Sequence, residues 1–123
     1  MQNYNLKLKS DLKQRCFNFS LKLIAFINNL PKNMASYTIS NQLLRSGISI
    51  GANLYEATAA SSRLEFKKFN EISLKSANET KYWLLLLKES KMSDLYKAQE
   101  LLNEVIELSK MIASGVLKLK GKK

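Results

Sequence analysis

Helix-breaking residues are scarce in this chain, and their positions divide it into four long segments. Only one proline, Pro31, and four glycines occur among 123 residues, which leaves long stretches free to be helical. Asparagines surround Pro31 at the first break, and Ser61 and Ser62 mark the second. Ser62 and Glu65 have the spacing of a capping box, and Ser93 is the expected cap of the last segment. The predicted helices cover residues 8–29, 37–60, 63–89 and 94–117.

Long helices joined by short links pack antiparallel, so the expected fold is an all-α, up-down-up-down four-helix bundle. One domain covering residues 1–123 is large enough to bury a core. Its apolar content of 46% is too high for a disordered chain. The last six residues, 118–123, include four lysines, and we expect them to fray as a basic tail.

The predicted helices carry more apolar surface than one isolated bundle can bury. The second helix has two apolar stripes on roughly opposite sides, one through Leu43 and one through Leu44, and the first and third helices are apolar well beyond one stripe. Gly47 and Gly51 are expected to let a neighbouring helix approach closely. The excess predicts self-association, unless long side chains and loops cover these faces. The predicted interface residues are Phe19, Phe26, Leu43, Ile50, Leu54, Tyr82 and Leu85.

The charge balance favours a polyanionic partner. Twenty basic and ten acidic residues give a formal net charge of +10, which suits RNA, DNA or an acidic membrane surface. Arg63, Lys67, Lys81 and Lys88 fall on one outer stripe of the third helix, and the basic tail could add phosphate contacts. The tail contributes Lys118, Lys120, Lys122 and Lys123. Two alternatives stay open: a merely solvated basic surface, and a basic stripe that meets the acidic side of the fourth helix in a neighbouring subunit.

Polar residues on the second and third helices predict a structural hydrogen-bond network that fixes helix register. Its proposed members are Arg45, Asn53, Glu56 and Glu79, although Arg45 and Glu56 are three turns apart and cannot pair directly. An acid/base pair or a metal site at Glu56 and Glu79 is the competing interpretation. The chain has no histidine and therefore no Glu-x-x-His metal motif. We expect no enzyme activity, catalytic residue, metal or cofactor, and we expect the single cysteine, Cys16, to pack in the interior.

No segment reaches the roughly 18 consecutive apolar residues of a membrane span. The first dozen residues are polar and rich in lysine, unlike a secretory signal. The expected location is cytoplasmic, without a membrane partner.

Two sequence blocks resemble a known family. The run 44–57 (LRSGISIGANLYEA) is similar to the second-helix motif of proteins encoded in 23S ribosomal RNA intervening sequences. The runs 62–66 (SRLEF) and 77–84 (ANETKYWL) resemble that family's third helix. The matched Arg45, Asn53, Glu56 and Glu79 look like hallmark positions of the family, and we interpret them as structural.

The resemblance implies a bacterial four-helix bundle that often forms a ring-shaped homopentamer. It also implies kinship with the accessory variability determinants of diversity-generating retroelements, which are basic pentameric bundles that bind nucleic acid and a reverse transcriptase. We therefore expect a non-enzymatic homo-oligomer, a pentamer by this resemblance, that binds RNA or DNA through a basic surface. The alternative is a protein-interaction scaffold or accessory subunit, for example of a reverse transcriptase.

Overall fold

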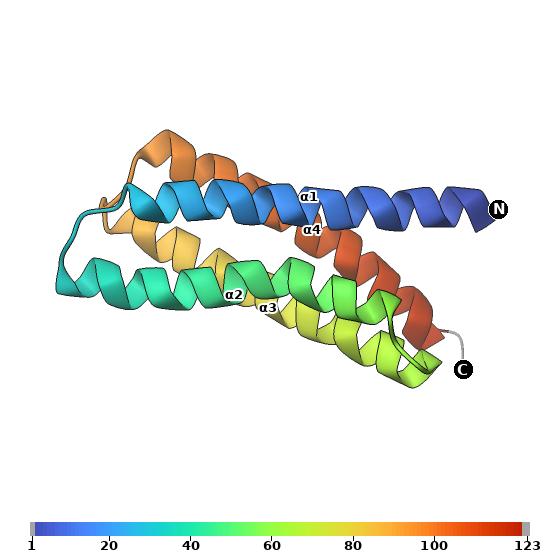
Figure 1. Cartoon of the computed structure of the whole chain (residues 1–123). Coiled ribbons are helices and arrows are strands. Elements are labelled where there is room, and N and C mark those ends of the chain that lie inside the picture. The colour runs from blue at the N-terminus through green and yellow to red at the C-terminus, as the bar shows by residue number, and fades with distance from the viewer. Residues whose placement is uncertain (1, 122–123) are drawn as a thin grey trace.

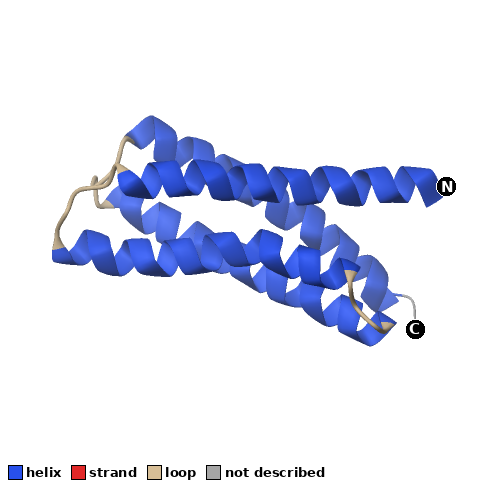
Figure 2. Ribbon diagram, in the orientation of Figure 1, coloured by secondary structure: helices blue, strands red, loops and turns tan. Residues whose placement is uncertain are grey.

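The chain folds into four antiparallel helices that run up, down, up and down (Figures 1 and 2). The computed structural model describes the backbone of residues 2–121 and the side chains of residues 11–121, so Lys122 and Lys123 lie outside it. The helices are α1 (Gln2–Asn28), α2 (Met34–Thr58), α3 (Arg63–Glu89) and α4 (Leu95–Gly121). Each helix packs against its two neighbours around the bundle, and in the described residues α1 does not contact α3. The predicted all-α four-helix bundle is confirmed.

Side-chain caps fix where the helices begin. The Asn33 side chain accepts a hydrogen bond from the backbone N–H of Ser36 at 2.9 Å and starts α2. Ser62 accepts from the N–H of Glu65 at 3.0 Å and starts α3, which confirms this half of the predicted capping box. The Glu65 carboxylate reaches back to the N–H of Ser61, one residue before the cap. These bonds satisfy amide groups that the helix itself cannot.

Two expectations about α4 are wrong. Asp94, not Ser93, supplies its cap, because the Asp94 carboxylate accepts from the N–H of Lys97 at 3.0 Å. The predicted tail is also helical as far as Gly121. Lysines are good helix formers and are favoured where the negative end of the helix dipole lies. Lys118 and Lys120 therefore extend the last turn of α4 instead of fraying from it.

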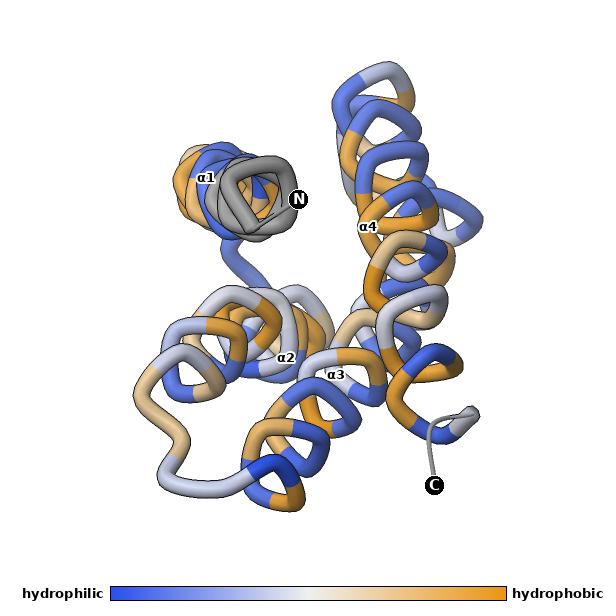
Figure 3. Tube along the Cα trace, turned by 90° about the vertical axis from the view of Figure 1, so that its right-hand side faces the viewer, coloured by the Kyte–Doolittle hydropathy of each residue, from blue (hydrophilic) through white to orange (hydrophobic). Residues whose placement is uncertain are grey.

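One apolar core runs through the bundle and receives side chains from all four helices (Figure 3). Five of the predicted interface residues belong to this core and are buried within a single chain, so assigning them to a subunit interface is wrong. These five residues are Phe19, Phe26, Leu43, Ile50 and Leu54. Tyr82 and Leu85, the other two, are exposed on α3.

The two glycines of α2 explain which of its apolar stripes faces inward. A Cβ atom on Gly47 would overlap the fully buried side chain of Leu23 on α1, and one on Gly51 would lie 3.2 Å from the Cβ of Cys16. The absence of these Cβ atoms lets α1 lie close to the stripe that contains Leu43. The other stripe, with Ile48 and Tyr55, faces outward.

Candidate nucleic-acid interface

One end of the bundle holds the N-terminal end of α1, the C-terminal end of α4 and the α2–α3 connection (Figure 1). Several basic residues lie at this end. There the start of α3 meets the end of α4: the Arg63 guanidinium donates to the carbonyl oxygen of Leu119 at 3.4 Å. Lys120 lies 3.6 Å from the carboxylate of Glu71 on α3. We call the cations of this end the basic cluster, which consists of Lys13, Arg63, Lys67, Lys110, Lys118 and Lys120.

The predicted basic stripe on α3 does not form one continuous surface. Arg63 and Lys67 are one turn apart at the basic cluster, but Lys81 is about 27 Å from Arg63 along the helix at 1.5 Å per residue. The Lys81 ammonium donates to Ser109 on α4 at 3.2 Å and is partly buried there. Lys88, in the last turn of α3, lies at the opposite end of the bundle. The structure thus groups Arg63 and Lys67 with Lys118 and Lys120 and separates them from Lys81 and Lys88.

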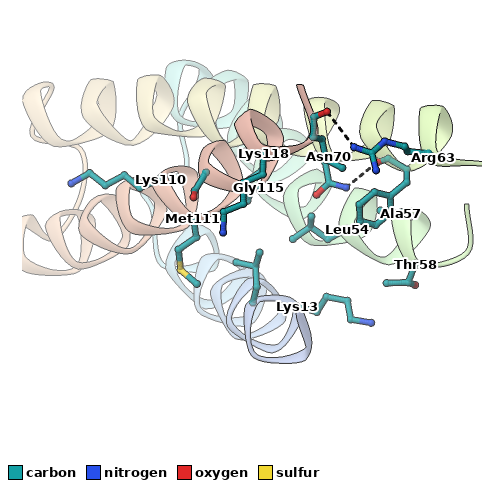
Figure 4. A pocket seen from close by; sticks show the side chains of 15 residues that line it. Lys13, Leu54, Ala57, Thr58, Arg63, Asn70, Lys110, Met111, Gly115 and Lys118 are labelled. Atoms are coloured by element: carbon teal, nitrogen blue, oxygen red, sulfur yellow. Dashed lines mark hydrogen bonds between the residues drawn. The ribbon is translucent and has the colours of Figure 1, made fainter. Parts of the chain in front are cut away.

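Two members of the basic cluster, Lys13 and Lys110, were not predicted from the sequence. Lys110 and Lys118 belong to the lining of a groove between α1 and α4 (Figure 4). Ser114 also lines this groove and lies between them at four-residue steps. Lys13 of α1 lies on the same groove. The four-residue spacing on α4 could have pointed to Lys110. The contribution of Lys13 depends on how α1 is placed, which no sequence pattern gives.

The groove has a volume of about 610 Å³ and lies between the diverging ends of α1 and α4. Its floor is apolar and comes from all four helices, through Leu12, Leu54, Ala57, Phe66, Met111 and Ile112. Its cations are Lys13, Arg63, Lys110 and Lys118, and no carboxylate belongs to the described lining. Figure 4 shows the Arg63 side chain turned toward the end of α4.

An exposed aromatic ring adjoins the basic cluster. The Tyr55 side chain on α2 is exposed, and the Lys13 ammonium lies 5.1 Å from the centre of its ring. A cation above an aromatic face is a favourable arrangement, and an exposed ring beside cations can also stack on an unpaired base. No sequence pattern places Tyr55 beside Lys13, because the two residues come from different helices.

Two carboxylates in the first half of α4 are paired with α1. Glu104 accepts a bidentate pair of hydrogen bonds from Arg15, at 2.7 and 3.1 Å, and Glu100 lies 3.7 Å from Lys22. The hydrogen bond to Glu104 raises the pKa of Arg15. From residue 108 to residue 121 α4 has no acidic residue. The helix is therefore acidic where it contacts α1 and basic where the groove opens.

A second polar cluster joins α2 to α3, close to the predicted network. Thr80 donates to the hydroxyl of Ser46 at 2.9 Å, Ser76 donates to the hydroxyl of Ser49 at 3.0 Å, and Ser73 donates to the carbonyl of Ile50 at 2.8 Å. These four serines and one threonine lie in or beside the core. Their partners fix the register of the two helices, because each hydroxyl group has a partner on the other helix.

Arg45 and Glu79 form an ion pair at the edge of this polar contact between α2 and α3, which we call the α2–α3 seam. Arg45 also donates to Gln42 at 2.9 Å, and the indole N–H of Trp83 donates to Glu79 at 3.0 Å. The Trp83 hydrogen bond, followed by Arg45, lowers the pKa of the Glu79 carboxyl below its ordinary value, despite partial desolvation. Arg45 thus has a partner on α3, which sequence reasoning did not identify.

The other two predicted network residues differ in their outcome. Asn53 donates to Ser49 at 2.8 Å, so it belongs to the seam. Glu56 is exposed and takes no part in the seam among the described residues. It lies eleven residues beyond Arg45, about 16 Å along the axis, whereas Glu79 lies directly beside Arg45. Glu56 and Glu79 are therefore too far apart to form the acid/base pair of the competing interpretation.

Within residues 11–121, no group of three or more acidic, cysteine or histidine side chains is arranged to hold a metal ion. Cys16 is buried in the core as predicted, and burial raises the pKa of its thiol to about 12. None of the described helices is long and apolar enough to cross a membrane.

A family model and a solved structure both match most of the chain. The family model of the 23S rRNA-intervening sequence protein matches residues 9–114. A crystal structure of a protein with unknown function from the S23 ribosomal protein family of Bacteroides thetaiotaomicron is similar, with a TM-score of 0.81 and 33% sequence identity. The match covers 88% of this chain and 96% of that one. No curated protein matches.

Proposed function

The chain belongs to the 23S rRNA-intervening sequence protein family, and from that premise we propose that it is a non-enzymatic, self-associating bundle that binds nucleic acid through the basic cluster. The observation that carries this proposal is the convergence of cations from α1, α3 and α4 at one end of the bundle. Charge contacts of this kind bind phosphates without reading sequence. We also propose that the chain is related to the accessory proteins of diversity-generating retroelements.

Binding across a salt series tests the phosphate contacts. We expect filter binding of a single-stranded RNA and of a duplex DNA to weaken steeply as salt rises, because phosphate contacts release counterions. The triple variant Lys67→Gln, Lys118→Gln and Lys120→Gln should reduce the slope of log affinity against log salt. Each lost contact lowers that slope by about 0.7 for single strands and 0.9 for duplex DNA.

The matched control removes three lysines from the opposite end of the bundle. Lys32, Lys91 and Lys97 lie in or next to the two connections at that end and are exposed. Their replacement by glutamine lowers the net charge by the same amount, so the salt slope of the control should stay close to that of the unmodified protein. Equal losses in both triple variants would show that only net charge matters and would reject the basic cluster as the site.

Exposed apolar side chains support self-association. One apolar face lies on the outer sides of α1 and α2, and the other lies on the back of α3. The first face consists of Phe17, Leu21, Ile24 and Ile48, and the second of Tyr82, Leu85 and Leu86. Because α1 and α3 are diagonal in the bundle, the faces point in different directions. Pairing of one face with the other in the next copy generates a ring when the rotation between copies closes the circle, and otherwise a filament. We propose the closed form, a homopentamer.

The same apolar faces favour a second candidate function, a scaffold for another protein such as a reverse transcriptase. Large exposed apolar residues are typical of protein interfaces. A pull-down of the reverse transcriptase that survives nuclease treatment would support this function. Loss of the partner after nuclease treatment would leave nucleic acid as the only bridge and reject it.

A further inference from the structure

The groove between α1 and α4 combines two properties that nucleic-acid binding does not require together. A phosphate backbone needs cations but no apolar floor, whereas this floor consists mainly of aliphatic side chains from Leu12, Leu54 and Ile112. At the same time, an uncharged apolar ligand would need no basic residues in the lining. The lining therefore suits a ligand that has both an apolar body and a negative charge.

The position of the groove in the bundle accounts for its shape. The Arg15–Glu104 pair holds α1 against α4, and the Arg15 guanidinium also contacts the sulfur of Met111 at 3.2 Å. Met111 lines the inner end of the groove, and beyond it the helices diverge. Gly115 lines the groove on α4, and a Cβ atom there would meet nothing within 4 Å. The groove is thus open space between helices, where bundles commonly hold ligands.

The size of the groove limits the ligand. A volume of about 610 Å³ falls within the range of roughly 300–1,000 Å³ that is usual for small-molecule sites. It can hold an extended alkyl chain. The stem of Lys118 can lie along the apolar wall while its ammonium group reaches a carboxylate at the rim.

We propose that this groove binds a free long-chain carboxylate, with the alkyl chain on the apolar floor and the carboxylate at the cationic rim. This site goes beyond the proposed nucleic-acid binding and does not depend on it. Charge complementarity favours an anion, because the described lining contains four basic residues and no carboxylate. Two of the four already have a neighbour in this structure: Lys13 lies over the Tyr55 ring, and Arg63 donates to the Leu119 carbonyl. The aliphatic floor selects the alkyl chain.

Calorimetric titration of the full chain with dodecanoate, below its micelle concentration, tests the proposal. Removing one buried methylene should weaken binding about fourfold, so decanoate should bind roughly fifteenfold more weakly than dodecanoate. Dodecan-1-ol should compete poorly because it lacks the charge. Absence of saturable dodecanoate binding, or an affinity that does not change with chain length, would overturn the assignment.

Two glycine variants localise the site. Gly115→Leu fills the groove without removing a cation and should weaken dodecanoate binding at least tenfold. Gly121→Leu places the same side chain in open space outside the groove and should bind as the unmodified protein does. Equal affinity in both variants would place the ligand elsewhere and contradict the proposal.

Failure of dodecanoate binding can be distinguished from failure of nucleic-acid binding. Gly115→Leu retains every cation of the basic cluster, so its RNA binding should be unchanged. Tight binding of an acidic amphipathic peptide without binding of dodecanoate would assign the groove to a protein partner and reject the carboxylate ligand.

Discussion

The close approach of α1 and α2 depends on a missing side chain. Gly47 faces Leu23, whose side chain is fully buried and would overlap an added Cβ atom. We expect Gly47→Ala to destabilise the protein by about 1–3 kcal/mol, because overpacking forces side chains or backbone to shift. Urea unfolding at fixed protein concentration measures this change.

Gly115 provides the matched control for that substitution. It is also helical, but the space around its Cβ position is open. Gly115→Ala should therefore stabilise the protein by about 0.5–1 kcal/mol through helix propensity alone. If Gly47→Ala shows the same gain as Gly115→Ala, the tight contact between α1 and α2 is wrong.

Glu79 links the α2–α3 seam to pH. Its hydrogen bond from Trp83 and its pairing with Arg45 lower its pKa in the folded state. A carboxyl with a lowered folded pKa contributes stability above its unfolded pKa, near 4.5, and this contribution is lost as the pH falls through the folded value. The side chain is partly exposed, so the contribution should stay below about 1 kcal/mol.

We therefore expect the stability difference between the unmodified protein and Glu79→Gln to shrink as the pH is lowered from 6 to 3. Urea unfolding at several pH values measures it. Glu56→Gln, which changes an exposed carboxylate outside the seam, should show no comparable trend. A difference between the unmodified protein and Glu79→Gln that is constant over this range would contradict the proposed stabilisation of the charged carboxylate.

At the level of helices, two adjacent residues at the start of α4 differ in their expected effect on stability. Asp94 caps the helix, whereas the hydroxyl of Ser93 is buried and has no hydrogen-bond partner among the described residues. Asp94→Ala should cost about 1 kcal/mol. Ser93→Ala should be neutral or stabilising, because it removes an unsatisfied polar group. Thermal unfolding of both variants distinguishes the two; a larger loss for Ser93→Ala would restore Ser93 as the cap.

Helix positions could be predicted from sequence, but pairings between helices could not. Ser62 and Glu65 indicated the start of α3 because a cap acts on its own helix. The partner of Arg45 is Glu79, which lies 34 residues away, and only the register of α2 against α3 brings them together. Periodicity revealed two apolar stripes on α2 without saying which one faces inward. Gly47 and Gly51 distinguish the inner stripe, because α1 packs closely against them.

At the scale of the whole molecule, the exposed apolar faces predict how copies assemble. Ring assembly requires that the α1–α2 face of one copy contact the α3 face of the next. Leu21→Lys should break the first face and Leu85→Lys the second, since each places a charge on an exposed apolar position. Loss of one large apolar contact, worth about 1.5–3 kcal/mol, should weaken association roughly tenfold to a hundredfold.

Sedimentation velocity of the separate and mixed variants tests the pairing of unlike faces. At the lowest protein concentration at which the unmodified protein is assembled, each variant alone should sediment as the 14.0 kDa monomer. The mixture should form a dimer of twice that mass, because the intact α3 face of Leu21→Lys can bind the intact α1–α2 face of Leu85→Lys. Neither end of that dimer can extend, since both free faces carry a lysine. Asn103→Lys, at an exposed polar position on α4, should leave assembly intact. Dimers of one variant alone would mean that like faces pair and that a ring cannot form in this way.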